Sequence, residues 1–153
     1  MKDYGYFSDK RYIITERDIP RHWYNYFFND EYVAFVSQVG FGQGIAQDSM
    51  GRRINLVDDR AVYVVEGNKF WQANGLPVHE GVEDYSCAHG IGYTDISLKK
   101  WNIRSECRYF VPNEGKKEYI RVTLTNESDT ERELKLIPYC ATEIDCRYAP
   151  QGY

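Results

Sequence analysis

The sequence predicts an all-β protein built as an antiparallel β-sandwich. Short strand-like runs alternate with turn residues along the 153 residues. Aromatic residues, which favour strands, make up 16% of the chain and include 14 tyrosines. No segment carries an amphipathic stripe longer than about two helical turns, and residues 23–28 are the one candidate for such a turn. A chain of this length can bury the core of one domain.

The first third of the chain predicts short strands and a glycine-rich turn. Residues 12–15 form a short β run, and residues 32–38 are apolar enough to be buried on both faces. Gly40, Gly42 and Gly44 then break the pattern. Because a strand follows them rather than a helix, they predict a turn or bulge and not a phosphate-binding loop.

A hairpin is predicted in the middle of the chain. Residues 53–57 and 61–66 both favour strands, and Asp58-Asp59-Arg60 between them favours a turn. Gly67-Asn68 ends the second of these strands. We therefore expect the two runs to pair with each other.

Three strands with alternating faces are predicted in the last third. Residues 102–111, 119–125 and 133–142 alternate apolar and polar side chains, and short turns join them, as in a meander. Pro138 cannot donate to a ladder, so the last strand should have an edge or a bulge there. The inward sets are Ile103, Ser105, Cys107, Tyr109 and Val111, then Ile120, Val122 and Leu124, then Leu134, Leu136, Pro138 and Cys140; Asn102, Arg104, Glu106 and Arg108 face outward.

Composition excludes several classes of protein. A net charge of -4 with scattered basic residues argues against nucleic-acid binding. No apolar run approaches the roughly 20 residues that span a bilayer, and the N-terminus shows no export signal, so we expect a cytoplasmic protein with no membrane partner. The four cysteines are widely spaced and favour reduced, buried thiols over disulfides; they are Cys87, Cys107, Cys140 and Cys146.

Residues 85–94 are the most informative stretch for function. Two glycines and a histidine interrupt strand-forming residues there, which predicts a short polar loop that presents His89 and Tyr93. Cys87 and His89 lie on one face of a strand and are the start of a metal-binding pattern, but no second pair completes it. The alternative is a buried thiol beside a hydrogen-bonding histidine, and we expect neither a metal nor a cofactor.

No catalytic centre is predicted. Hydrolysis of a sugar bond needs two carboxylates across the bond. The adjacent pairs Asp58-Asp59 and Glu83-Asp84 point to opposite faces of a strand. Glu143 and Asp145 can share a face, but nothing beside them marks a proton donor, and no G-x-S-x-G elbow occurs.

Tryptophan beside polar groups is a common arrangement for holding sugars, because a pyranose ring has an apolar face and hydroxyl edges. Trp23, Trp71 and Trp101 are the candidates. Trp71 is preferred since it precedes a polar loop with Asn74, and both residues are candidate carbohydrate or interface contacts. The alternative interpretation of Trp71 is a core residue.

A series of short motifs occurs in one order from residue 4 to about residue 143. Together they resemble the N-terminal β-domain of glycoside hydrolase family 94, the inverting sugar phosphorylases. The motifs are Tyr4-Gly5-Tyr6-Phe7, Tyr12-Ile13-Ile14-Thr15, Pro20-Arg21-His22-Trp23, Asn25-Tyr26, Ser37, Trp71-Gln72 with Pro77-Val78, residues 85–94, Tyr109-Phe110-Val111-Pro112, and Asn126-Glu127-Ser128 followed by Arg132.

The resemblance implies a β-supersandwich, similar to galactose mutarotase domains, that precedes a helical linker and a catalytic (α/α)6 barrel. Members cleave β-linked gluco-oligosaccharides with inorganic phosphate and release an α-sugar 1-phosphate. The catalytic aspartate and the phosphate-binding groups lie in the barrel. Residues 1–153 then form the N-terminal part of the β-domain, without the barrel, and the parent is expected to be a homodimer.

Two features of this chain qualify the resemblance. Ala88 stands where many members have arginine between the cysteine and histidine of residues 85–94, and residues 143–153 differ from well-known disaccharide phosphorylases, so the acceptor sugar stays open. As part of a larger β-domain, the chain should also expose sheet edges and apolar faces to a second copy or to the remainder.

Three function classes follow. The first is a non-catalytic domain of an inverting phosphorylase, in which residues 85–94 face the barrel or a dimer interface, or else only close the sandwich. The second is a free-standing carbohydrate-binding module. The third is a mutarotase-like epimerase, which needs a histidine acid and a carboxylate base such as His89 and Glu106. We rank the first class ahead of the other two.

Overall fold

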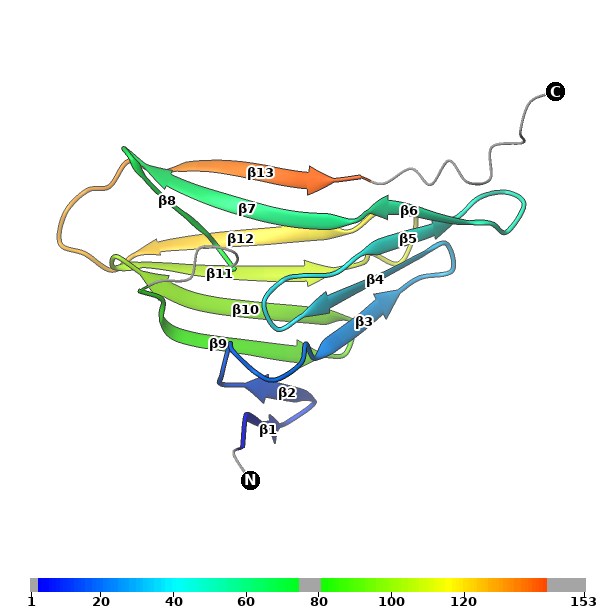
Figure 1. The fold of residues 1–153 in the computed structure, drawn as a ribbon, viewed down its shortest axis with the longest axis horizontal. Helices are drawn as coiled ribbons and strands as arrows, with labels where there is room; N and C mark the ends of the chain where they lie inside the picture. The colour runs from blue at the N-terminus through cyan, green and yellow to red at the C-terminus, as the bar shows by residue number, and fades with distance from the viewer. Residues whose placement is uncertain (1–2, 75–80, 143–153) are drawn as a thin grey trace.

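A computed structural model describes residues 3–74 and 81–142. These residues contain thirteen strands and no helix, which confirms the all-β prediction. The strands form three antiparallel sheets arranged as an open sandwich (Figure 1). Residues 23–28, the candidate helical turn, instead contain strand β3 (Tyr24–Phe28), because alternate aromatic side chains suit a strand with one buried face.

The largest sheet has six strands in the order β1-β2-β9-β10-β11-β12. Figure 1 shows it running from β1 at the bottom of the view up to β12. A two-residue turn joins β10 to β11, and its residues Trp101 and Asn102 both have positive φ, so Asn102 belongs to the turn and not to the strand. The strands are β1 (Gly5–Ser8), β2 (Arg11–Ile14), β9 (Glu83–Gly90), β10 (Tyr93–Lys100), β11 (Ile103–Phe110) and β12 (Tyr119–Asn126).

Two smaller sheets complete the sandwich. One has the order β3-β4-β5-β6 and the other has the order β13-β7-β8. The predicted turn after residue 38 is confirmed: Gly40 has a φ of 83° and the next strand begins at Gly44. The further strands are β4 (Tyr32–Ser37), β5 (Gly44–Gln47), β6 (Arg53–Val57), β7 (Asp59–Glu66), β8 (Lys69–Gln72) and β13 (Lys135–Ala141).

The predicted hairpin of residues 53–66 is wrong, because β6 and β7 lie in different sheets. Only Asp58 separates the two strands. None of residues 58–60 has the positive φ that a tight hairpin turn favours, so the chain continues forward and changes sheet. The backbone N–H of Asp58 donates to the carbonyl of Ala141, 2.9 Å away. The tight hairpin in this region is instead β7–β8, with Gly67 and Asn68 in its turn.

The predicted meander ends one strand early. β12 pairs with β11 as expected, but β13 crosses to pair with β7. The connection is held by Arg132, whose guanidinium bonds both carboxylate oxygens of Glu66 at the end of β7 and the carbonyl of Trp101. Pro138 lies on a strand that pairs on one side only, as predicted for an edge.

The alternating faces of β11 and β12 are confirmed. Ser105, Cys107 and Tyr109 on β11 are buried together with Ile103, whereas Arg104, Glu106 and Arg108 are not. β13 differs, because Leu136 is 47% exposed and its neighbour Ile137 is 51% exposed. In the described part of the chain, the outer edges of β12 and β13 carry no partner strand.

One core joins the three sheets. Side chains from every sheet are fully or almost fully buried in a single apolar cluster. Ser105 ties the layers together, because its hydroxyl donates to the carbonyl of Ala73, 2.6 Å away, just after β8. The cluster contains Ile14, Phe27, Tyr32, Ala34, Val36, Ala46, Val64, Trp71, Ala73, Cys87, Ile96, Ile103, Cys107 and Tyr109.

Candidate functional site

Residues 85–94 form a β-hairpin and not the predicted polar loop. β9 extends to Gly90 and β10 begins at Tyr93, so only Ile91 and Gly92 lie in the turn. Gly92 has a φ of 80°, which favours glycine. Gly90 faces the ring of Tyr93, and a Cβ at Gly90 would lie 2.4 Å from a ring carbon. One glycine therefore makes the turn and the other makes room for an aromatic ring.

His89 is held inside the domain by both ring nitrogens. Its Nε2 lies 3.0 Å from the carbonyl oxygen of Trp23, and its Nδ1 lies 3.0 Å from Oγ1 of Thr94. The side-chain amide of Asn25 donates to the same Thr94 oxygen and to the carbonyls of Gly90 and Tyr93. Asn25 thus connects β3 to both strands of the hairpin.

The partners of His89 define its tautomer. A carbonyl oxygen only accepts, so Nε2 must carry the proton, and Nδ1 then accepts from the hydroxyl of Thr94. Burial lowers the pKa of His89 below its usual value, and the bond to the Trp23 carbonyl opposes this only in part. The ring is therefore neutral near pH 7. Cys87 Sγ lies 3.8 Å from Nδ1, which fits the interpretation of a thiol beside a hydrogen-bonded histidine.

We expect acid to weaken the fold through His89. Its pKa is lower in the folded state, so the unfolded chain binds the extra proton first, and stability is lost as pH falls from about 6.5 toward the folded pKa. Between pH 7.5 and 5.5, chemical denaturation should show a larger loss of unfolding free energy for the wild type than for His89→Gln. Glutamine keeps a donor and an acceptor without titrating. His22→Gln, at an exposed position, is the control; equal pH slopes for wild type and His89→Gln would contradict the prediction.

Tyr93 belongs to a cluster of side chains that spans β10 and β11. The guanidinium of Arg108 lies 4.5 Å from the centroid of the Tyr93 ring. Both carboxylate oxygens of Asp95 accept hydrogen bonds of 2.6 Å from the same guanidinium. Asp95 and Arg108 are directly opposite each other in the ladder. The Tyr93 ring is thus fixed between Gly90 and Arg108.

An apolar groove lies beside the hairpin turn. It has a volume of about 470 Å³, and its walls come from β1–β2, β3 and the β9–β10 turn. Phe7 and Ile91 are each 82% exposed and Phe28 is 74% exposed. Lys10 and Arg11 add positive charge to the lining. His89, which is half-buried, contributes to the lining of this groove together with the exposed aromatic rings.

Trp71 lies on β8 and Asn74 follows that strand, and neither residue lines the apolar groove. Trp71 is fully buried and packs edge-on against Trp101, with ring centroids 5.3 Å apart. A buried indole offers no face to a pyranose ring, so its position supports the interpretation of a core residue. Trp101 is 38% exposed, with the amines of Lys69 and Lys100 near its ring. Asn74 is 2% exposed and lines a separate polar pocket.

A buried ion pair was missed by sequence reasoning. Nε of Arg60 lies 2.9 Å from Oε1 of Glu118, and the two side chains are 2% and 10% exposed. These two atoms are close enough to form an ion pair. The hydrogen bonds that the Arg60 guanidinium donates go instead to the carbonyl oxygens of Gly42 and Phe35. The Tyr32 hydroxyl donates to the other Glu118 oxygen. Burial raises the pKa of Glu118, and Arg60 and Tyr32 oppose this rise.

The candidate metal-binding and acid–base groups considered above are not brought together in the described residues. No group of three potential metal ligands occurs within residues 3–74 and 81–142. Burial raises the pKa of Cys107 to about 12, and raises that of Cys87 further, so neither thiol is a nucleophile at neutral pH. Glu106 points away from the core whereas His89 points into it, so the acid and base of an epimerase are not brought together. Glu143, Asp145 and Cys146 lie outside the described residues.

No helix in the described part is long and apolar enough to cross a membrane.

Comparison with known protein families shows the family of this chain. Residues 10–145 match the family described as "Glycosyl hydrolase 94, supersandwich domain". The chain belongs to this family. The antiparallel sheets and the shared core of this supersandwich domain agree with that assignment, and so does the motif series read from the sequence.

The relatives of this supersandwich domain are phosphorylases. One is 3-O-beta-D-glucopyranosyl-beta-D-glucuronide phosphorylase of Paenibacillus borealis, 35% identical over 137 residues, which covers 87% of this chain and 18% of the relative. Solabiose phosphorylase of the same organism is 31% identical, covering 95% of this chain and 21% of the relative. N,N'-diacetylchitobiose phosphorylase of Vibrio furnissii is 26% identical, covering 89% and 19%. The chain thus spans about a fifth of the length of the curated relatives it matches.

Proposed function

We propose that this supersandwich domain is the N-terminal, non-catalytic part of an inverting glycoside phosphorylase. The match of residues 10–145 to the family carries the proposal. One further observation supports it: the relatives are phosphorylases of about five times this length. The partner of the domain is then a catalytic (α/α)6 barrel.

The proposed parent reaction is phosphorolysis of a β-linked gluco-oligosaccharide. Inorganic phosphate is the co-substrate, and an α-sugar 1-phosphate is the product. The proposal includes a homodimeric parent in the cytoplasm. The relatives carry the names of three different sugar substrates, so the proposal stops at the substrate class.

A chimera tests the proposal. The 153-residue chain alone should form no sugar 1-phosphate from cellobiose and phosphate. Placed in the 35% identical P. borealis phosphorylase instead of the matched segment, it should retain measurable phosphorolysis, whereas deletion of that segment should abolish activity. Turnover by the chain alone would refute the non-catalytic role. Saturable β-glucan binding by the chain, together with an inactive chimera, would support the binding-module alternative.

We also propose that the β9–β10 turn contacts the catalytic barrel. Exposed Ile91 and Phe28 border an apolar groove, and exposed patches of this kind commonly mark interaction sites. Ile91→Asp in the chimera should lower kcat/KM by about tenfold, which corresponds to a loss of about 1.4 kcal/mol of transition-state stabilisation if the contact positions the barrel for catalysis. Met50→Asp, at another exposed apolar position, is the control. Unchanged kinetics and dimer mass for Ile91→Asp would show that the hairpin only closes the sandwich.

A further inference from the structure

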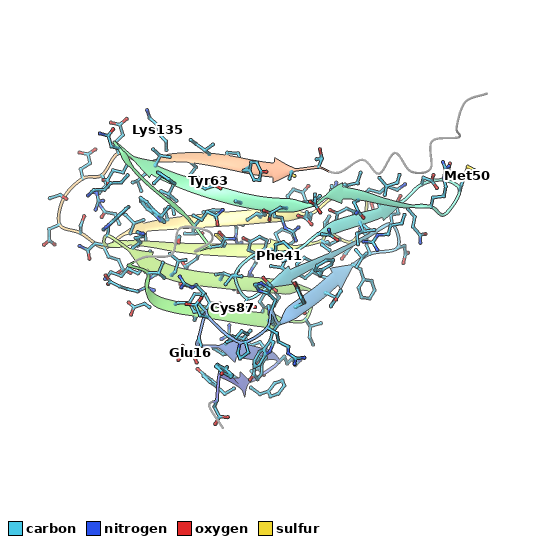
Figure 2. The ribbon with its side chains drawn as sticks, viewed as in Figure 1. Glu16, Phe41, Met50, Tyr63, Cys87 and Lys135 are labelled. Carbon is cyan, nitrogen blue, oxygen red and sulfur yellow. The ribbon has the colours of Figure 1, made fainter. Side chains whose placement is uncertain are left out.

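A polar pocket lies between the three-stranded sheet and the turn that joins β4 to β5. Its volume is about 300 Å³. Figure 2 labels Tyr63 on β7 and Phe41 on the turn, the two elements that face each other across it. The lining comprises Val39, Gly40, Phe41, Asp59, Arg60, Tyr63, Gln72, Asn74 and Tyr139.

Two buried acceptors in this pocket have no donor among the residues that the structure describes. Gln72 is 6% exposed and Asn74 is 2% exposed, and neither Oε1 of Gln72 nor Oδ1 of Asn74 has a hydrogen-bond partner within residues 3–74 and 81–142. Buried carbonyl-type oxygens almost always accept a hydrogen bond, because leaving one unpaired is costly. The pocket is therefore ready to receive hydroxyl or amine donors.

The orientation of the Asn74 amide is fixed by its surroundings. Its Nδ2 donates to the carbonyl of Val39, 3.1 Å away, which leaves Oδ1 as the free atom. Gly40 makes this contact possible: it has a φ of 83°, and a Cβ there would lie 1.9 Å from Asn74 Nδ2. The turn is thus packed directly onto the amide.

The charges around the pocket disfavour an anion. Asp59 contributes a carboxylate to the lining. Arg60 is the one cation in the lining, and Glu118 and two backbone carbonyls already occupy its guanidinium. Free acceptors beside a carboxylate repel phosphate and carboxylate groups. The matching ligand carries hydroxyl donors and no negative charge.

Aromatic side chains border the same pocket. Phe41 is 41% exposed and Tyr139 is 49% exposed, and Tyr63 also belongs to the lining. Aromatic faces pack against the C–H face of a sugar-like ring while fixed polar groups bind its hydroxyls. We propose that this pocket binds one uncharged polyhydroxylated ring, whose hydroxyls donate to Gln72 Oε1 and Asn74 Oδ1. The site is separate from any bond cleavage and goes beyond the non-catalytic role proposed above.

Titration with D-glucose, followed by NMR, tests the site in the protein. The side-chain amide resonances of Gln72 and Asn74 should shift and saturate, and Gln72→Met should weaken the affinity about tenfold, as expected for one hydrogen bond. Gln47→Met, the same change at an exposed position on β5, should leave the affinity unchanged. Tetrahydropyran, which has the ring without the hydroxyls, and inorganic phosphate should not bind.

Three results would overturn the proposal. They are amide resonances that glucose does not move, equal affinity in wild type and Gln72→Met, and competition by phosphate. The first shows that glucose does not enter the pocket, and the third shows an anion site. Because the amide resonances are followed in the wild type, the test stands even if Gln72→Met fails to fold. No outcome depends on phosphorolysis, so the result is independent of the proposed parent activity.

Discussion

Arg60→Met is expected to lower the free energy of unfolding by about 3–5 kcal/mol, since removing one member of a buried ion pair leaves the other charge uncompensated. Glu118 is 10% exposed and would lose its cation, and the carbonyls of Gly42 and Phe35 would lose their donors. Urea denaturation followed by tryptophan fluorescence measures the change. The effect is large because the guanidinium holds β7 to the β4–β5 turn and to the segment before β12.

The double variant Arg60→Met with Glu118→Gln measures the interaction free energy between the two side chains apart from the contacts that each makes with other residues. If the two charges stabilise each other, the double variant should lose less free energy than the sum of the two single variants. Arg104→Met, which breaks a solvent-exposed ion pair with Glu127, is the control and should change stability far less. Additive losses in the double variant would contradict the ion-pair argument.

Trp71→Ala is the second change with a large expected effect, again about 3–5 kcal/mol of unfolding free energy. The indole is fully buried at the centre of the cluster shared by the three sheets. Its removal leaves a cavity against Trp101, which packs edge-on at 5.3 Å. Thermal and urea unfolding of the purified protein measure the loss.

The neighbouring residue supplies a matched control. Phe70 lies on the opposite face of β8 and is 54% exposed, so Phe70→Ala removes an aromatic ring without opening the core. It should change stability by no more than about 0.5 kcal/mol. Equal losses for the two variants would contradict the burial of Trp71. Reduced sugar binding by Trp71→Ala with unchanged stability would instead restore its interpretation as a sugar platform.

The strands and the faces of their side chains were predictable because successive side chains of a strand alternate between its two faces. This pattern can be read from neighbouring residues alone. The alternation of Ile103 to Tyr109 and of Ile120 to Leu124 needs no knowledge of partners, and the structure confirms both runs. Pairing was less predictable. Residues that favour turns lie at both ends of β7, and nothing local shows that the first set joins two sheets instead of making a hairpin with β6. The crossing of β13 depends on Arg132 and Glu66, which lie 66 residues apart.

The candidate residues were found, but their surroundings were not predictable. Residues 85–94 lie within the segment that matches the family, whereas their conformation depends on a Tyr93 ring packed over Gly90. Asn74 was selected for its place after Trp71, yet its free oxygen is apparent only once the turn at Gly40 is placed against it. Such features depend on contacts between distant segments, and a single sequence does not show them.

The passage of the chain through Asp58 has a consequence for ligand entropy. A single residue links two sheets, and the walls of the polar pocket come one from each: β7 and β8 on one side and the β4–β5 turn on the other. With Arg60 bonded to that turn as well, the walls cannot move apart independently. A ligand that binds between walls already fixed in place costs the protein little conformational entropy. More of the free energy of its contacts therefore contributes to its affinity.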